Sequence, residues 1–282
     1  MKKNFSAVKT ALTIAGSDPS GGAGVQADLK AFAATGVYGF SVVSAITAQN
    51  SLGVKHSWPL TGVQVAEQLR SLNTDYEIHA MKTGMLANAE VIDAIAENLP
   101  SCALVIDPVM QASLGANLLS ADGLRAAQIR LWPKSALLTP NIPEAEAVLG
   151  ISITDQAGML RAARMLFDFG VPAILLKGGH LPSHAEVSAE CNDLLLIKDA
   201  SSAIWFTAKR IPKKTHGTGC VFSALITAKL ALGAPLALAC QRAHAALQEA
   251  LTHAQPMGER QRASPDGFSE RYTKADYDCT QD

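Results

Sequence analysis

A short run of small and polar residues, 215–220 (THGTGC), leads directly into an apolar segment with helical spacing. Gly217 and Gly219 would let backbone N–H groups converge on an anion, and the start of the helix adds partial positive charge there. In phosphoryl transfer, a site of this kind stabilises the charge that develops on the moving phosphoryl group. Cys220 falls in the first turn of the helix, where the pKa of a thiol tends to be lowered. The run therefore predicts an anion-binding loop, although a small buried cysteine at a helix start and a loop histidine bonded to backbone are equally good local explanations.

Oxygen and amine groups that could hold a nucleotide occur at two further places. Asn141 and Glu144 are three residues apart around a predicted helix start. That spacing puts an amide and a carboxylate on one side of the turn, and such ligands suit Mg²⁺, usually through retained waters. A helix-capping pattern explains the pair at least as well. Lys177, at a predicted strand end before two glycines, could reach a phosphate, although a lone lysine is more often a surface residue.

A second glycine-rich loop lies near the start of the chain. Residues 22–27 (GAGVQA) fit the dinucleotide pattern G-x-G-x-x-A, but six residues separate them from the preceding strand. The acidic residue that the pattern needs about 20 residues later is also missing. We therefore reject a nicotinamide site here, and the lack of any G-x-x-x-x-G-K-[ST] motif excludes a P-loop kinase. Asp28, in the first turns of the next helix, is by itself expected to be a solvated carboxylate near the positive end of the helix dipole.

The segments that must position these residues are predicted strands and predicted helices in alternation along the chain. Short apolar or β-branched runs predict strands, and segments with helical spacing lie between them. The predicted strands are 11–15, 39–47, 79–83, 104–107, 136–139, 173–177, 193–197 and 204–207. The predicted helices are 24–35, 63–72, 89–99, 121–131, 143–149, 156–169, 218–232 and 235–253. This alternation predicts an α/β fold with a mainly parallel central sheet flanked by helices on both faces, and a hairpin formed by the last two strands.

Ligands of such folds bind beyond the carboxyl ends of the parallel strands. Polar and glycine residues end or directly follow most of the predicted strands, including Asp107 at the end of the fourth and Lys177 at the end of the sixth. We therefore expect these residues to gather at one end of the sheet.

The amino-acid composition indicates a globular protein and excludes several other classes. The chain has 282 residues, 48% of them hydrophobic and 17% charged, and a formal net charge of -1. Disorder and coiled coil are excluded, and no basic surface for nucleic acid is expected. Residues 31–54 carry no charge, but they contain too many polar and glycine residues for a membrane span. With no repeat and no internal linker, we predict one domain over 1–254 and a polar tail over 255–282.

The five cysteines are scattered and form no C-x-x-C pair. An odd, irregular set of this kind predicts neither a disulfide framework nor a zinc site. We expect reduced thiols and a cytoplasmic protein.

Taken together, seven motifs resemble the hydroxymethylpyrimidine/phosphomethylpyrimidine kinases of thiamine biosynthesis, in the ribokinase-like superfamily. The resemblance covers about residues 11–253 and keeps the order and ordinary spacing of the motifs. The motifs are 15–24 (AGSDPSGGAG) with 26–30 (QADLK), 47–50 (TAQN), 82–86 (KTGML), 107–110 (DPVM), 139–141 (TPN), 177–180 (KGGH) and 215–220 (THGTGC).

The resemblance implies a three-layer ribokinase-like fold, usually as a homodimer, with ATP and Mg²⁺ as cosubstrates. It implies two successive phosphorylations: first of 4-amino-5-hydroxymethyl-2-methylpyrimidine, then of its monophosphate to the diphosphate. It assigns Gln49 as the reader of the pyrimidine edge, because an amide offers a donor and an acceptor side by side. Other pocket residues implied for the substrate are Gly16, Ala23, Asp28, Met85 and Val109.

For the phosphate end, the resemblance implies catalytic and nucleotide contacts from Lys177, Thr218 and Asn141. It places the anion hole at Gly217, Thr218, Gly219 and Cys220, and the Mg²⁺ ligands at Asn141, Glu144 and Asp107. Cys220 stands where many superfamily relatives have an aspartate base, so we expect it near the acceptor oxygen without assigning it as the base. Residues 256–282 do not match the family's usual glycine-rich end, and Lys214 replaces a more frequent Asn.

Two alternatives to this function remain open. A pyridoxal kinase of the same superfamily would share most motifs, although Gln49 and the complete 177–180 segment favour a pyrimidine. A non-catalytic pyrimidine-binding protein would keep Gln49, but it would not need the anion loop or Asn141 and Glu144.

Overall fold

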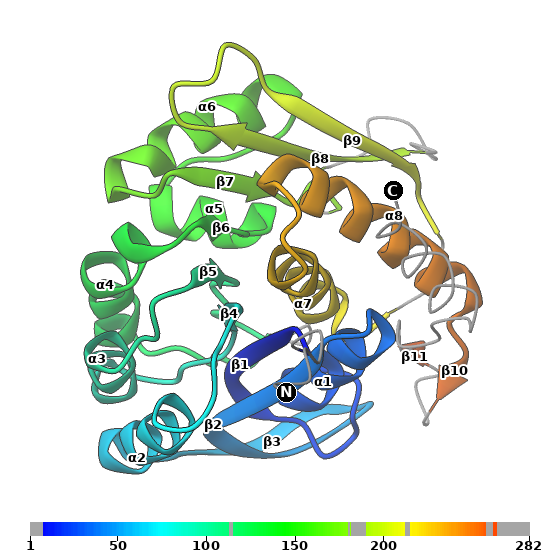
Figure 1. The fold of residues 1–282 in the computed structure, drawn as a ribbon. Helices are drawn as coiled ribbons and strands as arrows, with labels where there is room; N and C mark the ends of the chain where they lie inside the picture. The colour runs from blue at the N-terminus through cyan, green and yellow to red at the C-terminus, as the bar shows by residue number, and fades with distance from the viewer. Residues whose placement is uncertain are drawn as a thin grey trace, which may run out of the picture.

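The protein folds into three layers, a central sheet between two sets of helices (Figure 1). The computed structural model describes residues 8–112, 115–179, 181, 190–211, 215–257 and 262–263. Within these residues, nine strands form one sheet in the order β3-β2-β1-β4-β5-β6-β7-β8-β9. Their bounds are β1 (Thr10–Ser17), β2 (Tyr38–Asn50), β3 (Gly53–Pro59), β4 (Ala80–Thr83), β5 (Ala103–Ile106), β6 (Leu137–Leu138), β7 (Ala173–Leu176), β8 (Glu190–Ile197) and β9 (Ile204–Lys209).

The six inner strands, from β2 to β7, are parallel, and the edge strands are antiparallel to their neighbours. The predicted hairpin at the end of the sheet is confirmed as β8 paired with β9. Because helices cover both faces, β1 and β4 to β7 are buried almost throughout and carry mainly apolar residues. β2 is less covered and is exposed at Tyr38, Ile46 and Asn50.

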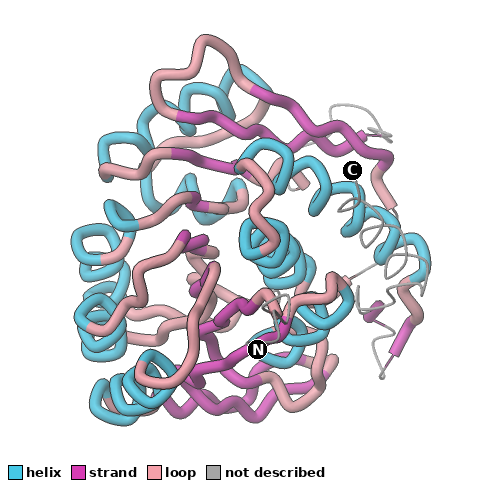
Figure 2. The backbone as a smooth tube through the Cα atoms, in the orientation of Figure 1, coloured by secondary structure: helices cyan, strands magenta, loops and turns pink. Residues whose placement is uncertain are grey.

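Two groups of helices cover the sheet (Figure 2). Leu12 and Ile14 of β1 belong to the core that one group forms, and Ala11 belongs to the core of the other. The first group is α2 (Gly62–Asn73), α3 (Ala89–Glu97), α4 (Ala121–Arg130), α5 (Ile142–Leu149) and α6 (Gln156–Leu166). The second is α1 (Gly24–Ala34), α7 (Thr218–Ala231) and α8 (Leu236–His253).

Side-chain caps explain where several helices begin. Asn88, Asn141 and Asp155 precede α3, α5 and α6, and each accepts a hydrogen bond from an amide of the first turn. Gly150, in the left-handed conformation, ends α5. α7 differs, since no side chain caps its start.

Every predicted helix and strand is present in the described part of the chain, with shifted ends. β3 was not predicted: its sequence GVKHSWP has no clear apolar pattern, and among the described strands it pairs with β2 alone, at the sheet edge. Residues 31–54 form the end of α1, a turn, β2 and the first residues of β3. The helix end, the turn and the buried strand were expected here, and the start of β3 was not. In the described residues, no helix is long and apolar enough to cross a membrane. Two short strands, β10 (Pro256–Met257) and β11 (Arg262–Ala263), fall in the predicted tail, most of which lies outside the described residues.

Candidate active site

A cavity of about 920 Å³ lies beyond the carboxyl ends of the parallel strands. Its size is within the usual range for small-molecule sites. The residues after five of these strands line it together: Asp18, Met85, Asp107, Asn141 and Lys177. The expected gathering of polar residues at one end of the sheet is thereby confirmed.

The 215–220 loop forms one wall of this cavity and starts α7. Gly217 is the N-cap with a φ of +75°, and a side chain there would place its Cβ 1.8 Å from the carbonyl oxygen of Gly22. Only glycine therefore lets the two glycine loops touch. Because no side chain caps α7, the amides of its first turn are available to an anion in the cavity.

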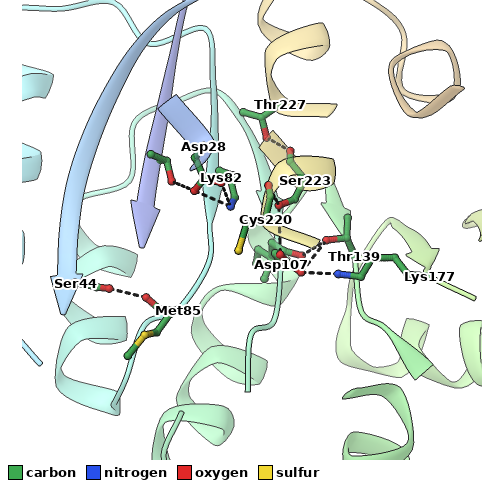
Figure 3. Close-up of polar contacts among 12 residues, drawn as sticks. Asp28, Ser44, Lys82, Met85, Asp107, Thr139, Lys177, Cys220, Ser223 and Thr227 are labelled. Carbon is green, nitrogen blue, oxygen red and sulfur yellow. Dashed lines mark hydrogen bonds and ion pairs between the residues drawn. The ribbon is translucent and has the colours of Figure 1, made fainter. Parts of the chain in front are cut away.

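Asp107 is the centre of a buried polar network beside this loop (Figure 3). Its Oδ1 accepts a hydrogen bond from Lys177 Nζ at 2.8 Å, and its Oδ2 accepts one from the Ser223 hydroxyl at 3.3 Å. Burial opposes the charge of Lys177, but the Asp107 and Glu144 carboxylates raise its pKa. A Cβ at Gly219 would lie 3.2 Å from Lys177 Nζ, so the glycine leaves the ammonium group facing the loop.

Asn141 and Glu144 form the capping box that was the local alternative to a metal site. The Glu144 amide donates to Asn141 Oδ1 at 2.8 Å, and the Asn141 amide donates to Glu144 Oε2 at 2.8 Å. Burial raises the pKa of Glu144 to about 7, with Lys177 opposing the shift and Asp107 adding to it. In the described residues, no three His, Cys, Asp or Glu side chains come together as a metal cluster. Two carboxylates still suit Mg²⁺ that is held mainly by phosphate oxygens and waters, so Glu144 and Asp107 fit that ion.

The structure corrects the expectation for the Cys220 thiol. Burial raises its pKa to about 11; the charge of Lys82 opposes this shift and the Asp28 and Asp107 carboxylates add to it. The helix start was expected to lower the pKa, but the loss of hydration outweighs that effect. Cys220 lines the cavity as a thiol rather than a thiolate.

The residues expected to bind the pyrimidine, with one exception, line the same cavity. These are Gly16, Ala23, Gln49, Met85 and Val109. The Ser44 hydroxyl donates to the Met85 carbonyl oxygen and fixes this loop (Figure 3). A Cβ at Gly16 would lie 2.8 Å from Met85 Sδ, so glycine at this position makes room for the thioether.

Asp28 is the exception, and both expectations for it need correction. It is fully buried, does not line the cavity and is not solvated at a helix end. Lys82 Nζ lies 2.9 Å from each of its carboxylate oxygens, and the Thr13 hydroxyl donates to Oδ2 at 2.6 Å (Figure 3). The carboxylate turns inward because a buried ammonium group from β4 lies there to pair with it. Asp28 therefore supports the cavity from beneath rather than contacting a ligand in it.

Three residues of the site were missed from the sequence: Asp18, Thr47 and His216. His216 Nε2 lies 2.9 Å from Gln49 Nε2 and 3.0 Å from Asp18 Oδ2, and all three residues line the cavity. The histidine bonds side chains, whereas a backbone-bonded loop residue was expected. Its partners lie 167 and 198 positions away in the chain, so local spacing gives no sign of these contacts. His180 of the 177–180 motif lies outside the described residues.

Comparisons with known proteins agree with this geometry. The sequence profile described as phosphomethylpyrimidine kinase matches residues 18–264, most of the chain and some way past residue 254. The chain belongs to the phosphomethylpyrimidine kinase family. It is 43% identical over 259 residues to the hydroxymethylpyrimidine/phosphomethylpyrimidine kinase of Haemophilus influenzae, covering 90% of this chain and 95% of that protein.

Solved structures give the same superfamily fold. The phosphomethylpyrimidine kinase of Clostridium difficile is 38% identical, with a TM-score of 0.73, covering 86% of this chain and 99% of that one. The pyridoxal kinase of Staphylococcus aureus in complex with pyridoxal is 30% identical, with a TM-score of 0.82, covering 94% and 96%. The ribokinase-like, three-layer fold expected from the resemblance is confirmed.

Proposed function

We propose that this phosphomethylpyrimidine kinase family member uses ATP and Mg²⁺ to phosphorylate 4-amino-5-hydroxymethyl-2-methylpyrimidine and then its monophosphate, in thiamine biosynthesis. The observation that carries the proposal is a single cavity lined both by Gln49, Met85 and Val109 and by the loop that starts α7. Such a cavity can hold an acceptor and a phosphoryl donor together, which supplies the positioning on which phosphoryl transfer depends.

The protein's own groups divide this work. Gln49 would pair with the aminopyrimidine edge, and Met85 and Val109 would cover its apolar face. Lys177, kept charged by Asp107, would contact phosphate oxygens, and the first amides of α7 would stabilise the charge growing on the transferred group. Mg²⁺, when bound near Glu144 and Asp107, neutralises charge on the phosphate oxygens. With its pKa near 11, Cys220 would contact the acceptor oxygen as a neutral group.

A pyridoxal kinase activity is the second candidate, because pyridoxal kinase structures have the higher TM-scores, 0.80 to 0.83 against 0.73. Sequence identity favours the pyrimidine kinases, at 38% against 30%. Gln49 also favours a pyrimidine, since an amide matches an adjacent donor and acceptor. We therefore place pyridoxal as a side substrate, with the lower kcat/KM.

Three broader proposals accompany the activity. A homodimer is supported by large exposed apolar residues on the edge ribbon formed by β2 and β3. A cytoplasmic location is supported by free cysteines, since none of the four in the described part of the chain forms a disulfide. A single kinase domain over 1–254, followed by a polar tail over 255–282, is supported by the nine-stranded sheet, to which β10 and β11 of the tail do not belong.

A product assay with the hydroxymethylpyrimidine and excess Mg-ATP, resolving monophosphate from diphosphate, tests the activity. We expect both products in succession from the wild-type protein.

Two variants test the assigned residues. Gln49→Ala should lower kcat/KM for the pyrimidine with the KM for ATP little changed, because polar ligand atoms lose their partner. Gly219→Val should abolish transfer, since its side chain would fill the space beside Lys177 Nζ. An active Gly219→Val enzyme, or a much higher kcat/KM on pyridoxal than on the pyrimidine, would contradict the proposal.

A further inference from the structure

His216 joins Gln49 and Asp18 through one ring nitrogen. Its Nε2 lies 2.9 Å from the side-chain amide of Gln49 and 3.0 Å from Asp18 Oδ2. A ring nitrogen either carries a hydrogen and donates, or lacks one and accepts. The partners of His216 therefore decide which of the two it does.

Asp18 requires a donor. Its carboxylate already accepts hydrogen bonds from the Ser20 amide and hydroxyl and from the Ala23 amide, and its side chain is 3% exposed. Burial alone would raise the pKa of Asp18, but the bonds from His216 and Ser20 outweigh it and the pKa is lowered. An ionised carboxylate only accepts. His216 Nε2 therefore carries a hydrogen and donates it to Asp18.

Thr47 constrains the Gln49 amide from its other side. The Thr47 hydroxyl donates its single hydrogen to the Ser17 carbonyl oxygen at 2.8 Å, and its oxygen lies 3.5 Å from Gln49 Oε1, with Gln49 Nε2 toward His216. That oxygen can only accept from Gln49. The oxygen and nitrogen of an amide exchange places by a half-turn of the group, so their partners assign them. The one Nε2 hydrogen can be shared between Asp18 Oδ2 and a second acceptor as a three-centre bond, whereas an amide NH₂ group would face it donor to donor. Both neighbours therefore favour the amide oxygen toward His216 and the amide nitrogen toward Thr47.

We propose that His216, oriented by Asp18, is a positioning residue that sets the direction of the Gln49 amide and so determines which pyrimidine edge the enzyme accepts. In this direction the amide oxygen keeps one lone pair, and the nitrogen one hydrogen, for the substrate. An amino group beside an unprotonated ring nitrogen satisfies both. The 4-oxo analogue presents an acceptor and a ring N–H in those places, and it would bind only if the amide turned over and lost both protein contacts. The inference rests on the proposed function, in which Gln49 reads the pyrimidine.

The direct test compares kcat/KM for the 4-amino substrate with kcat/KM for its 4-oxo analogue. We expect the wild type to prefer the amino compound strongly, because the wrong edge leaves buried polar groups unpaired. In His216→Ala and in Asp18→Asn the amide is free to turn, and this preference should fall by at least about tenfold. His253→Ala is the matched control, since this exposed histidine at the end of α8 has its ring bonded to the Glu249 carbonyl oxygen one turn back and does not line the cavity, so it should keep the wild-type preference.

A second measurement does not depend on the variants folding. Ring ¹⁵N spectra of the wild-type protein, with His216 assigned through its proximity to Gly22, should show a hydrogen on Nε2. An unprotonated Nε2 would overturn the inference, and so would equal losses of kcat/KM for both compounds in His216→Ala. The proposed function fails separately: it fails if the wild type does not phosphorylate the 4-amino compound, whatever His216 does.

Discussion

At the residue scale, the groups around the anion loop act through fixed charge and hydrogen bonding more than through proton abstraction. Below a pKa of about 11 the Cys220 thiol is mostly protonated, which makes it a poor base at neutral pH. A loose, metaphosphate-like transition state makes little demand on a base. Lys177, Asp107 and the first amides of α7 lie where phosphate charge would develop, so we expect most of the catalytic effect to come from them.

Glu144 should make the stability of the ligand-free protein depend on pH. Its pKa is about 7 in the folded protein and 4.5 ordinarily, so between these values the folded state holds a proton that the unfolded chain releases. This contribution is fully present below pH 4.5 and is lost as the pH rises through 7, at most about 3 kcal/mol in all. Glu144→Gln removes the titration while keeping the capping box.

The free energies of unfolding in urea at pH 5 and pH 8 measure this contribution. The wild type should lose stability relative to Glu144→Gln over that interval. A difference between the two proteins that does not change with pH would show that Glu144 is ionised in the fold.

At the element scale, local patterns predicted most of the fold. Apolar runs and helical spacing are properties of neighbouring residues, so every inner strand and its following helix could be placed from the sequence. β3 could not be predicted in this way, because an exposed edge strand needs no apolar pattern. Its pairing with β2 is what makes it a strand. Strand ends also predicted the gathering of Asp107, Asn141 and Lys177, because parallel strands end at the same edge.

Contacts between residues far apart in the chain could not be predicted from local patterns. Asp28 and Lys82 are 54 residues apart, and nothing in either motif indicates that they pair beneath the site. The contacts of His216 with Gln49 and Asp18 bridge still longer separations. The pKa of Cys220 also depended on packing, since burial overrode the effect of the helix start.

The pair formed by Asp28 in α1 and Lys82 in β4 should be essential to the stability of this part of the sheet. Both side chains are fully buried, and Asp28 helps keep the pKa of Lys82 above its ordinary value although burial opposes this. Lys82→Met leaves the carboxylate buried without its counter-ion, which should lower the free energy of unfolding by about 3–5 kcal/mol. Urea unfolding followed by circular dichroism measures the loss.

The double variant Asp28→Asn/Lys82→Met is the control for that loss. It removes both charges, so it should recover part of the stability that Lys82→Met loses. If Lys82→Met is as stable as the wild type, the buried pair does not support the fold as described.

At the scale of the whole molecule, the cavity needs no basic surface to hold polyphosphate. The chain has 24 lysines and arginines against 25 acidic residues, yet the cavity wall offers Lys177 and the start of α7. Hydrogen-bond donors and one ammonium group at the site can therefore bind phosphate without an overall positive charge on the protein. Among the large apolar side chains exposed in the described part of the chain, Trp58 is the largest.

The edge ribbon of β2 and β3 is where we expect a second copy of the chain to pack. Ile46 and Trp58 are register partners on one face of the ribbon and are 50% and 54% exposed. A pair of large apolar side chains beside an unpaired strand edge is a usual site of association. The same ribbon carries Gln49, which lines the cavity, so its packing also bears on the pyrimidine end of the site.

Trp58→Glu should therefore convert a dimer to a monomer, because it places a charge where two copies would bury an apolar face. Light scattering after size-exclusion chromatography measures the mass, and the expected monomer is about half the wild-type value. Ile129→Glu is the matched control, since Ile129 is 73% exposed on α4, away from the ribbon, and should leave the mass unchanged. A looser ribbon in the Trp58→Glu monomer should also raise the KM for the pyrimidine and leave the KM for ATP near the wild-type value. A wild type that is already monomeric, or a Trp58→Glu protein that stays dimeric, would exclude this ribbon as the interface.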